Sequence, residues 1–227
     1  MTADVGHPYG TLVGRKWARD AQGRIQVDSA SGLPVANPDQ VILGNYNPDW
    51  VGGITNTFTY KNISLSFLLD GQWGGNVYSV TKWFGNYAGI LKGTLQGREI
   101  DWDNPGYVVP NAVYEPGSAW AGQPDTTHVN IQDYYENTFY AQETGMVDAT
   151  YLKLRDARIA YQLPDRWVQR LGFSSATFSL VGHNLLIWTK QDIIDPETAF
   201  DAANRQGVEN GQLPTARTIG FTFTIRP

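Results

Sequence analysis

The sequence contains no cysteine and comparatively few charged residues, and both shortages limit what it can do. Without cysteine, a disulfide framework, a thiolate nucleophile and a cysteine-ligated metal are all excluded. Charged residues make up 17% of the 227 positions, whereas a typical soluble domain carries about 25%. The net charge of -5 is opposite to the clustered basic surface that nucleic acids require, so we expect no nucleic-acid partner.

Motifs for catalysis and cofactor binding are also lacking. The histidines His7, His128 and His183 are too far apart for a metal-binding pattern such as HExxH. No GxSxG, Walker or Rossmann motif is present. We therefore expect a protein that is not an enzyme, with no catalytic residue, no cofactor and no metal ligand. A glycan-active hydrolase stays open as an alternative, because the sequence cannot show two carboxylates facing each other across a cleft.

Long apolar runs are missing too. No segment approaches the roughly 20 apolar residues of a transmembrane helix. The stretch MTADVGHPYG has neither the basic nor the apolar region of a signal peptide, so either the protein is cytoplasmic or Met1 is not the natural start. Aromatic side chains, by contrast, are abundant, at 13% of all residues with 8 tryptophans and 12 tyrosines.

The clearest pattern is a pair of alternating segments, 51–60 and 63–71. Their apolar positions are spaced two apart and alternate with threonine and serine, and Leu68 alone is out of step. Because side chains alternate between the two faces of a strand, the pattern predicts a β-hairpin with one apolar and one small polar face. The link Lys61-Asn62 predicts a two-residue turn in which Asn62 takes the positive φ. The apolar positions are Ile54, Phe58, Tyr60, Ile63, Leu65, Phe67 and Leu69.

Three further segments alternate in the same way, namely 146–161, 176–188 and 215–226. In the first of them the apolar parity changes near Arg155-Asp156, which predicts a β-bulge. Short helices are expected at 77–87, 131–140 and 165–171, the last of them closed by Gly172. The fold class is therefore all-β, an antiparallel meander with a few short helices.

The remaining segments are long and irregular. Residues 1–50 predict a loop region with one small hairpin between 11–13 and 24–27, turned at Asp20–Gly23. Residues 72–145 and the polar loop 189–214 are far longer than ordinary hairpin loops of about 2–5 residues. In a meander, both long loops leave the same side of the sheet and the short links leave the other. Outer-membrane β-barrels have that asymmetry, so the chain favours a partial transmembrane β-barrel formed by 51–227.

Five dispersed segments resemble the C-terminal barrel region of the SusC/RagA family of TonB-dependent outer-membrane transporters. They occur in the family's order and span most of residues 42–226. One departure is the end of the chain, since the family usually closes its last strand on an aromatic residue and this sequence ends Ile225-Arg226-Pro227. The segments are ILGNYNPDWVGGITNTFTYKNISLSFLLDGQWGGNVYS (42–79), ATYLKLRDARIAYQLP (149–164), FSLVGHNLLIWTK (178–190), DPE (195–197) and RTIGFTFTI (217–225).

The resemblance implies a C-terminal fragment of an importer of glycans or peptides in the outer membrane. The strands would form part of the barrel wall, and residues 1–50 and the long loops would lie on the extracellular side. Its implied partners are a SusD-like lid lipoprotein, membrane lipid, an oligosaccharide or peptide substrate, and TonB through N-terminal parts absent from this sequence. The alternative from another class is a soluble, aromatic-rich carbohydrate-binding β domain.

The candidate substrate contacts are the tryptophans of the long section, because flat aromatic rings stack on sugars. They can equally fill a small core of the loop or form an interfacial aromatic girdle. Asp195-Pro196-Glu197 marks a loop motif that resembles an ordinary turn more than a cation loop. Lys153, Arg155 and Arg158 are expected on the lumen face or at a rim, since arginine facing lipid at mid-bilayer costs about 2–4 kcal/mol. The tryptophans are Trp73, Trp83, Trp102 and Trp120.

Overall fold

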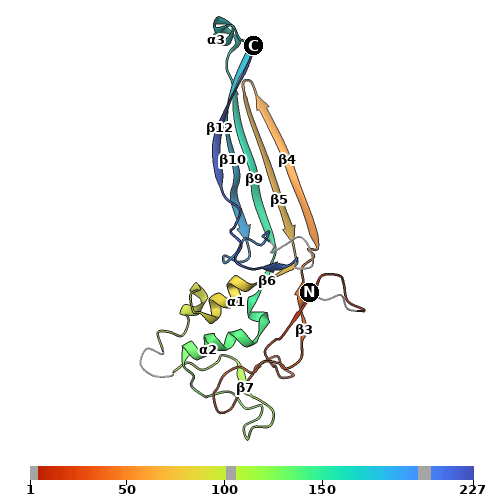
Figure 1. The fold of residues 1–227 in the computed structure, drawn as a ribbon, viewed down its shortest axis with the longest axis vertical. Coiled ribbons are helices and arrows are strands. Elements are labelled where there is room, and N and C mark those ends of the chain that lie inside the picture. The colour runs from red at the N-terminus through yellow and green to blue at the C-terminus, as the bar shows by residue number, and fades with distance from the viewer. Residues whose placement is uncertain (1–4, 101–105, 199–205) are drawn as a thin grey trace. The chain divides into compact units, whose positions relative to one another are not determined.

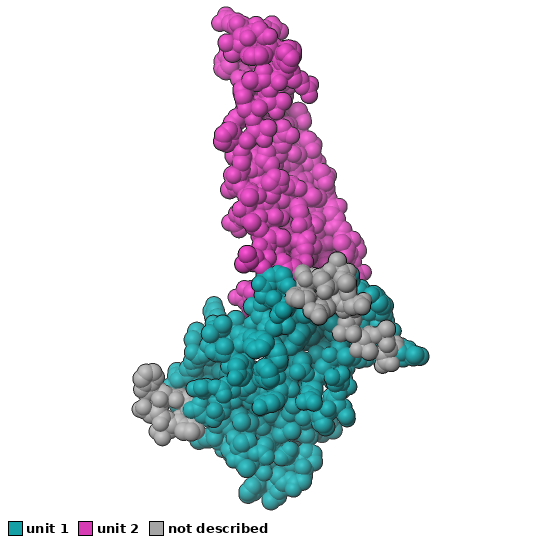
Figure 2. All heavy atoms as spheres, viewed as in Figure 1, with its two compact units in different colours: residues 1–47, 76–147, 199–212 teal, residues 48–75, 148–198, 213–227 magenta. Residues whose placement is uncertain are grey.

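A computed structural model describes residues 5–100, 106–198 and 206–227. The chain forms two compact units, each assembled from several stretches of sequence (Figure 2). Unit 1 contains residues 1–47, 76–147 and 199–212, and unit 2 contains residues 48–75, 148–198 and 213–227. The long section after the hairpin therefore groups with the N-terminal region in space. Among the described residues, no helix has the length and apolar character needed to cross a membrane.

Unit 2 is an open five-stranded sheet (Figure 1). The strand order is β12-β10-β9-β5-β4, and every neighbouring pair is antiparallel, which confirms the expected meander. The strands are β4 (Trp50–Tyr60), β5 (Ile63–Trp73), β9 (Tyr151–Gln162), β10 (Ser175–Thr189) and β12 (Thr218–Arg226). A short helical link joins β9 to β10, as α3 (Asp165–Val168) and η4 (Gln169–Leu171), and Gly172 closes it with a φ of 81°.

The turn between β4 and β5 differs from the prediction in one detail. The positive φ falls on Lys61, at 52°, and not on Asn62. Asn62 instead contacts strand β9, because its side-chain amide donates to the Gln162 carbonyl at 2.9 Å. Its own carbonyl accepts from the Gln162 amide at 2.8 Å. The turn thus ties three strands together at one end of the sheet.

The predicted bulge in β9 is confirmed, and both neighbouring strands respond to it. On the β5 side the register jumps between Leu68 and Leu69, and on the β10 side it jumps between His183 and Leu186. Arg155 is the residue of β9 that neither register pairs. Because of this extra residue, Arg155 and Asp156 can share one face while the apolar pattern continues on the other.

The described residues of unit 1 form three small sheets. Strand β1 (Thr11–Gly14) pairs with β3 (Val41–Asn45), and β2 (Ile25–Val27) pairs in parallel with β7 (Ala112–Tyr114). The expected hairpin between 11–13 and 24–27 is therefore wrong, although the turn at Asp20–Gly23 exists and is closed by an Arg19–Ile25 bridge. Both strands find partners distant in sequence, which local pattern cannot reveal. The third sheet has the order β11-β6-β8, from β6 (Asn76–Ser79), β8 (Met146–Asp148) and β11 (Val208–Glu209).

Capped helices complete unit 1, close to where the sequence places them. The Ser79 hydroxyl accepts from the Lys82 amide at 2.9 Å and starts α1. The Asn130 side chain accepts from the Gln132 amide at 2.8 Å and starts α2. Such caps satisfy amides that the first helical turn leaves free. The helices are α1 (Val80–Tyr87), η1 (Lys92–Leu95), α2 (Ile131–Asn137), η2 (Thr138–Tyr140) and η3 (Gln142–Gly145).

The core of unit 1 is buried in the ordinary way for a small domain. Val27 from β2 is fully buried and packs among side chains of β7, of α2 and of the segments that precede these two elements. Burial of such side chains stabilises a fold by about 1.5–3 kcal/mol each. Its members are Val27, Tyr107, Val109, Ala112, Tyr114, Val129 and Ile131.

Candidate functional site

One face of the unit 2 sheet, here called the apolar face, is apolar across all five strands. The registers align its side chains in rows perpendicular to the strands. Ile54 is 66% exposed and Phe221 is 75% exposed, so in this structure the face lies open. Two of the rows are Tyr60–Ile63–Tyr161–Phe178–Phe223 and Phe58–Leu65–Ile159–Leu180–Phe221.

Aromatic side chains gather at both ends of the apolar face. At one end Trp50 pairs with Trp73 across β4 and β5, and Trp188 lies on β10 beside Leu152. A Cβ on Gly52 would lie 2.4 Å from Trp50 Cζ2, so only glycine lets this ring lie along the strand. At the other end, Tyr60 and Tyr161 belong to the last full row. The face is therefore an aliphatic and aromatic band with aromatic rings at its two limits.

The opposite face, here called the polar face, carries mainly small and polar side chains. One of its rows is Thr59–Ser64–Ala160–Ser179–Thr222. The Arg158 guanidinium donates to the Ser179 hydroxyl at 2.9 Å on this side. Lys153 pairs with Asp70 of β5 in the register, so it shares this face as well. The sheet differs from that of a soluble protein, because large apolar side chains of the apolar face are exposed while Lys153 and Ser179 of the polar face are buried.

Five charged residues form a cluster on the polar face, here called the ion cluster. Lys153 is 1% exposed, and its ammonium lies 2.9 Å from both carboxylate oxygens of Asp195 and 2.6 Å from Glu197 Oε2. Arg155, the bulge residue, donates to Asp70 at 3.0 and 2.7 Å and to Glu197 at 3.1 and 2.6 Å. The cluster thus joins β5 and β9 to the loop between β10 and β12.

The loop motif Asp195-Pro196-Glu197 is the loop's contribution to this cluster. The Asp195 carboxylate also accepts from the Thr215 hydroxyl at 2.7 Å and from the Glu197 amide at 3.1 Å. Burial raises the pKa of Asp195, but hydrogen bonds from Lys153 and Thr215 outweigh it and hold the pKa below 3.8. Burial also raises the pKa of Glu197, and hydrogen bonds from Arg155 and Lys153 hold it below 4.5. Both groups are therefore anchoring carboxylates, ionised at neutral pH.

The three candidate tryptophans that the structure describes have different surroundings. Trp73 lies at the aromatic end of the apolar face, with the Lys190 ammonium 5.0 Å from its ring centroid. Trp83 on α1 stacks on Phe139 with centroids 4.4 Å apart, and its indole nitrogen is buried without a hydrogen-bond partner. Trp120 contacts Tyr114, in a different ring cluster of unit 1. Trp102 lies outside the described residues.

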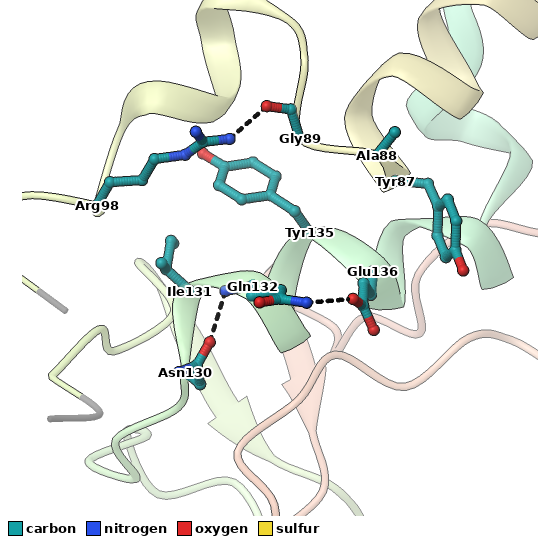
Figure 3. Close-up of a pocket in the computed structure, with 9 residues that line it drawn as sticks. All are labelled: Tyr87, Ala88, Gly89, Arg98, Asn130, Ile131, Gln132, Tyr135 and Glu136. Carbon is teal, nitrogen blue, oxygen red and sulfur yellow. Dashed lines mark hydrogen bonds between the residues drawn. The ribbon is translucent and has the colours of Figure 1, made fainter. Parts of the chain in front are cut away.

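Two cavities in unit 1 adjoin helix α2, and sequence reasoning did not anticipate either. The first, of about 470 Å³, is drawn in Figure 3. One of its lining residues is Tyr135, whose hydroxyl donates to the Gly93 and Gln96 carbonyls. The Arg98 guanidinium donates to the Gly89 carbonyl in the same cavity. The second, of about 520 Å³, shares Tyr87 and Glu136 with the first. The sequence did hold a sign of the second cavity, since several aromatic residues cluster in the helices predicted at 77–87 and 131–140.

Comparisons with known proteins agree with this architecture. No family model matches the chain. TonB-dependent receptor P26 of Formosa agariphila is 30% identical over 199 residues, which cover 84% of this chain and 18% of that protein. TonB-dependent receptor P3 of the same organism is 22% identical over 213 residues, which cover 91% of this chain and 19% of that protein. The chain thus spans about a fifth of the length of these relatives.

A weaker sequence match has an enzyme's name. The protein called DNA ligase 4 from Aspergillus oryzae is 22% identical over 165 residues, covering 72% of this chain and 16% of that protein. The fold agrees with the receptors instead. A chain of the RagAB peptide importer in the closed-closed state matches with a TM-score of 0.59 at 17% identity, covering 94% of this chain and 23% of that one. In sequence and in fold, the chain therefore belongs with the SusC/RagA-like TonB-dependent receptors and corresponds to one part of their length.

Proposed function

We propose that this chain forms part of the barrel wall and outer mouth of a nutrient importer in the outer membrane. The observation that carries the proposal is the open apolar face of unit 2, with aromatic rings at both limits and polar side chains on the reverse. Strands of outer-membrane barrels have this arrangement, apolar toward lipid and polar toward the lumen. Ile54, Phe58 and Ile159 would then contact lipid, whereas Lys153, Arg155 and Arg158 would face the lumen.

The dimensions of the apolar face support this assignment. Strand β4 runs from Trp50 to Tyr60, from one aromatic limit to the other. Ten residue steps of about 3.3 Å give about 33 Å along the strand, and a tilt of about 40° reduces this to about 25 Å of depth. An outer-membrane barrel has an apolar band about 25 Å tall between its aromatic girdles. Trp73 would then belong to an aromatic girdle and not to a sugar-binding site.

The connections define an orientation for the wall. The Lys61-Asn62 turn and the α3 link leave one end of the sheet, and the long segments leave the other. In outer-membrane barrels the short turns are periplasmic and the long loops extracellular. Unit 1, with Trp83 and Trp120, would thus lie outside the cell and contribute to the mouth. The loop motif Asp195–Glu197 would fix the second long loop to the lumen side of the wall.

The transport role of the whole protein follows from its relatives. One structural neighbour is the RagAB peptide importer, which supports a peptide cargo. The resemblance to the SusC/RagA family adds glycans as a second cargo class and a SusD-like lid lipoprotein as a partner. The curated relatives are named TonB-dependent receptors, which supports energy coupling through TonB. In this scheme the strands and loops described here have no catalytic role. Energy coupling would depend on other parts of the receptor.

The behaviour of the chain in plain buffer and in detergent tests the proposal. Its apolar face needs lipid or detergent, so the chain in plain buffer should aggregate. In detergent micelles it should stay dispersed, with strand content by circular dichroism. A monomer that melts cooperatively in plain buffer would contradict the proposal and support the soluble carbohydrate-binding β domain.

A further inference from the structure

The second cavity of unit 1 combines aromatic rings with carboxylates, and is here called the Tyr87 groove. Its rings come from the end of α1 and from η2, and all of them are 37–58% exposed. Its carboxylates, Asp133 and Glu136, stand one turn apart on α2. The volume of about 520 Å³ falls in the range of roughly 300–1,000 Å³ typical of small-ligand sites. The rings are Phe84, Tyr87, Phe139 and Tyr140.

The rings hold one another in place and do not depend on a ligand for order. The centroids of Tyr87 and Phe139 are 5.3 Å apart, and those of Phe84 and Phe139 are 6.0 Å apart. Trp83 stacks beneath this group on Phe139. The Asn137 amide donates to the Pro34 carbonyl at 2.7 Å and closes one side of the groove. The groove is therefore formed before any ligand arrives.

The polar atoms left for a ligand are mainly acceptors. One N–H of the Asn137 side-chain amide donates to the Pro34 carbonyl, and the Gln132 side-chain amide donates to Glu136 Oε1 at 2.8 Å. The carboxylate of Asp133 and the second oxygen of Glu136 remain as acceptors, beside the hydroxyls of Tyr87 and Tyr140. Sugar hydroxyls both donate and accept, whereas ammonium and guanidinium groups only donate. An acceptor-rich groove thus fits a cation better than a neutral sugar, and repels a polyanionic one.

The position of Glu136 adds a second argument. Asp133 lies in the first turn of α2, where a negative charge is favourable for the helix. Glu136 lies near the C-terminal end of the same helix, three residues from another carboxylate, and both features are unfavourable for it. The hydrogen bond from Gln132 to Glu136 offsets part of this cost, so the charges of the helix favour Asp133 and disfavour Glu136. A cation bound between the two carboxylates would relieve their repulsion, and the neighbouring rings would stabilise it through cation–π contacts.

We propose that the Tyr87 groove binds the lysine or arginine side chain of a basic peptide, with the aliphatic stem on the rings and the charge between Asp133 and Glu136. This inference deepens the proposed function, because it selects basic peptides from the two cargo classes. Peptide binding to the groove is nevertheless measured independently of lipid contact. A result that contradicts binding to the groove would therefore leave the assignment of the barrel wall standing, and a result that contradicts the wall would leave the groove standing.

Isothermal titration calorimetry of the full chain in detergent tests the groove. The probes are the capped tripeptides Lys-Phe-Lys, Gln-Phe-Gln and Glu-Phe-Glu, with maltotetraose as the neutral sugar. We expect saturable binding of Lys-Phe-Lys, binding weaker by about tenfold for the glutamine peptide, and none for the glutamate peptide. Tighter binding of maltotetraose or of Glu-Phe-Glu would overturn the proposal, as would no heat from any probe.

Variants locate the binding and separate it from general attraction between opposite charges. The double variant Asp133→Asn/Glu136→Gln should weaken Lys-Phe-Lys binding by about tenfold, and Tyr87→Leu by about threefold. Tyr87→Phe keeps the ring and should lose less affinity than Tyr87→Leu. Asp39→Asn removes an exposed carboxylate of unit 1 outside the groove and is the matched control. An equal loss in Asp39→Asn and in the double variant, or full binding by Tyr87→Leu, would contradict a specific groove. Circular dichroism of each variant confirms that the fold is intact.

Discussion

The two units of this chain differ in where they place their apolar side chains. Unit 1 buries them: Val27 and its neighbours form a closed core, and aromatic rings pack on one another. Unit 2 exposes many of them on its apolar face, and its largest fully buried side chains are Lys153 and Ser179 on the polar face. Unit 1 thus has an ordinary apolar core, whereas the apolar face of unit 2 fits the lipid contact proposed for it. The two units of one chain therefore have surfaces suited to different surroundings.

The largest expected effect lies in the ion cluster of unit 2. Lys153→Met removes the cation and leaves the buried Asp195 carboxylate without its main partner. Breaking one side of a buried pair costs about 3–5 kcal/mol of unfolding free energy. The exposed pair of Lys190 and Asp148, 2.7 Å apart, is the control, and Lys190→Met should cost no more than about 1 kcal/mol. Urea titration in detergent compares the two, and equal costs would show that the ion cluster is not a buried anchor.

A second change tests the two faces of the sheet directly. Ile54→Arg places a charge near the middle of the apolar face, and should cost about 2–4 kcal/mol in phospholipid vesicles. Thr55→Arg places the same charge one residue further on, toward the polar face, and should cost far less. The free energy of unfolding from vesicles measures both. Similar costs at the two positions would remove the distinction between the faces.

Acid should release the loop that Asp195 and Glu197 anchor. Both carboxylates have a folded pKa below the unfolded value, so their stabilisation is present above the unfolded pKa and is lost as pH falls through the folded pKa. Stability should thus be constant above about pH 5 and fall below about pH 4. Pepsin cleavage within 189–217, followed across this window, measures the release. Asp195→Asn should flatten the pH dependence, and an unchanged profile would exclude Asp195 as its source.

The smallest effect concerns the Lys61-Asn62 turn. Lys61 adopts a φ of 52°, a region that a lysine side chain disfavours and asparagine tolerates. Lys61→Asn should therefore raise the unfolding free energy by about 0.5 kcal/mol. Lys61→Ala retains the Cβ and should have little effect, which makes it the control. Destabilisation by Lys61→Asn in a urea titration would show that the turn is not strained at this position.

The sequence predicts unit 2 well because its information is local. Alternation identifies every strand of the sheet, and the parity change at Arg155-Asp156 reveals the bulge. The ion cluster is not predictable in this way, since Lys153 and Asp195 are 42 residues apart. The sequence places a lysine on a strand, and only the fold shows which carboxylates it pairs with.

Unit 1 is harder to predict because its contacts are distant in sequence. Strand β2 pairs with β7, and the Tyr87 groove combines α1, α2 and η2 with the segment around Leu33. The tryptophans attracted attention as isolated aromatic residues, yet Trp83 serves mainly to pack against Phe139. Composition indicates which side chains can bind a ligand, and only the packing indicates which of them remain free to do so.

Single-cysteine labelling tests the central claim most directly, because the sequence contains no cysteine of its own. Cysteines placed one at a time from Ile54 to Thr59, in this chain reconstituted into phospholipid vesicles, can carry an environment-sensitive probe. The account predicts a period of two, with probes at Ile54 and Phe58 in lipid and probes at Thr55, Thr57 and Thr59 in water. Probes that all report water, or that show no alternation, would contradict a membrane-facing sheet.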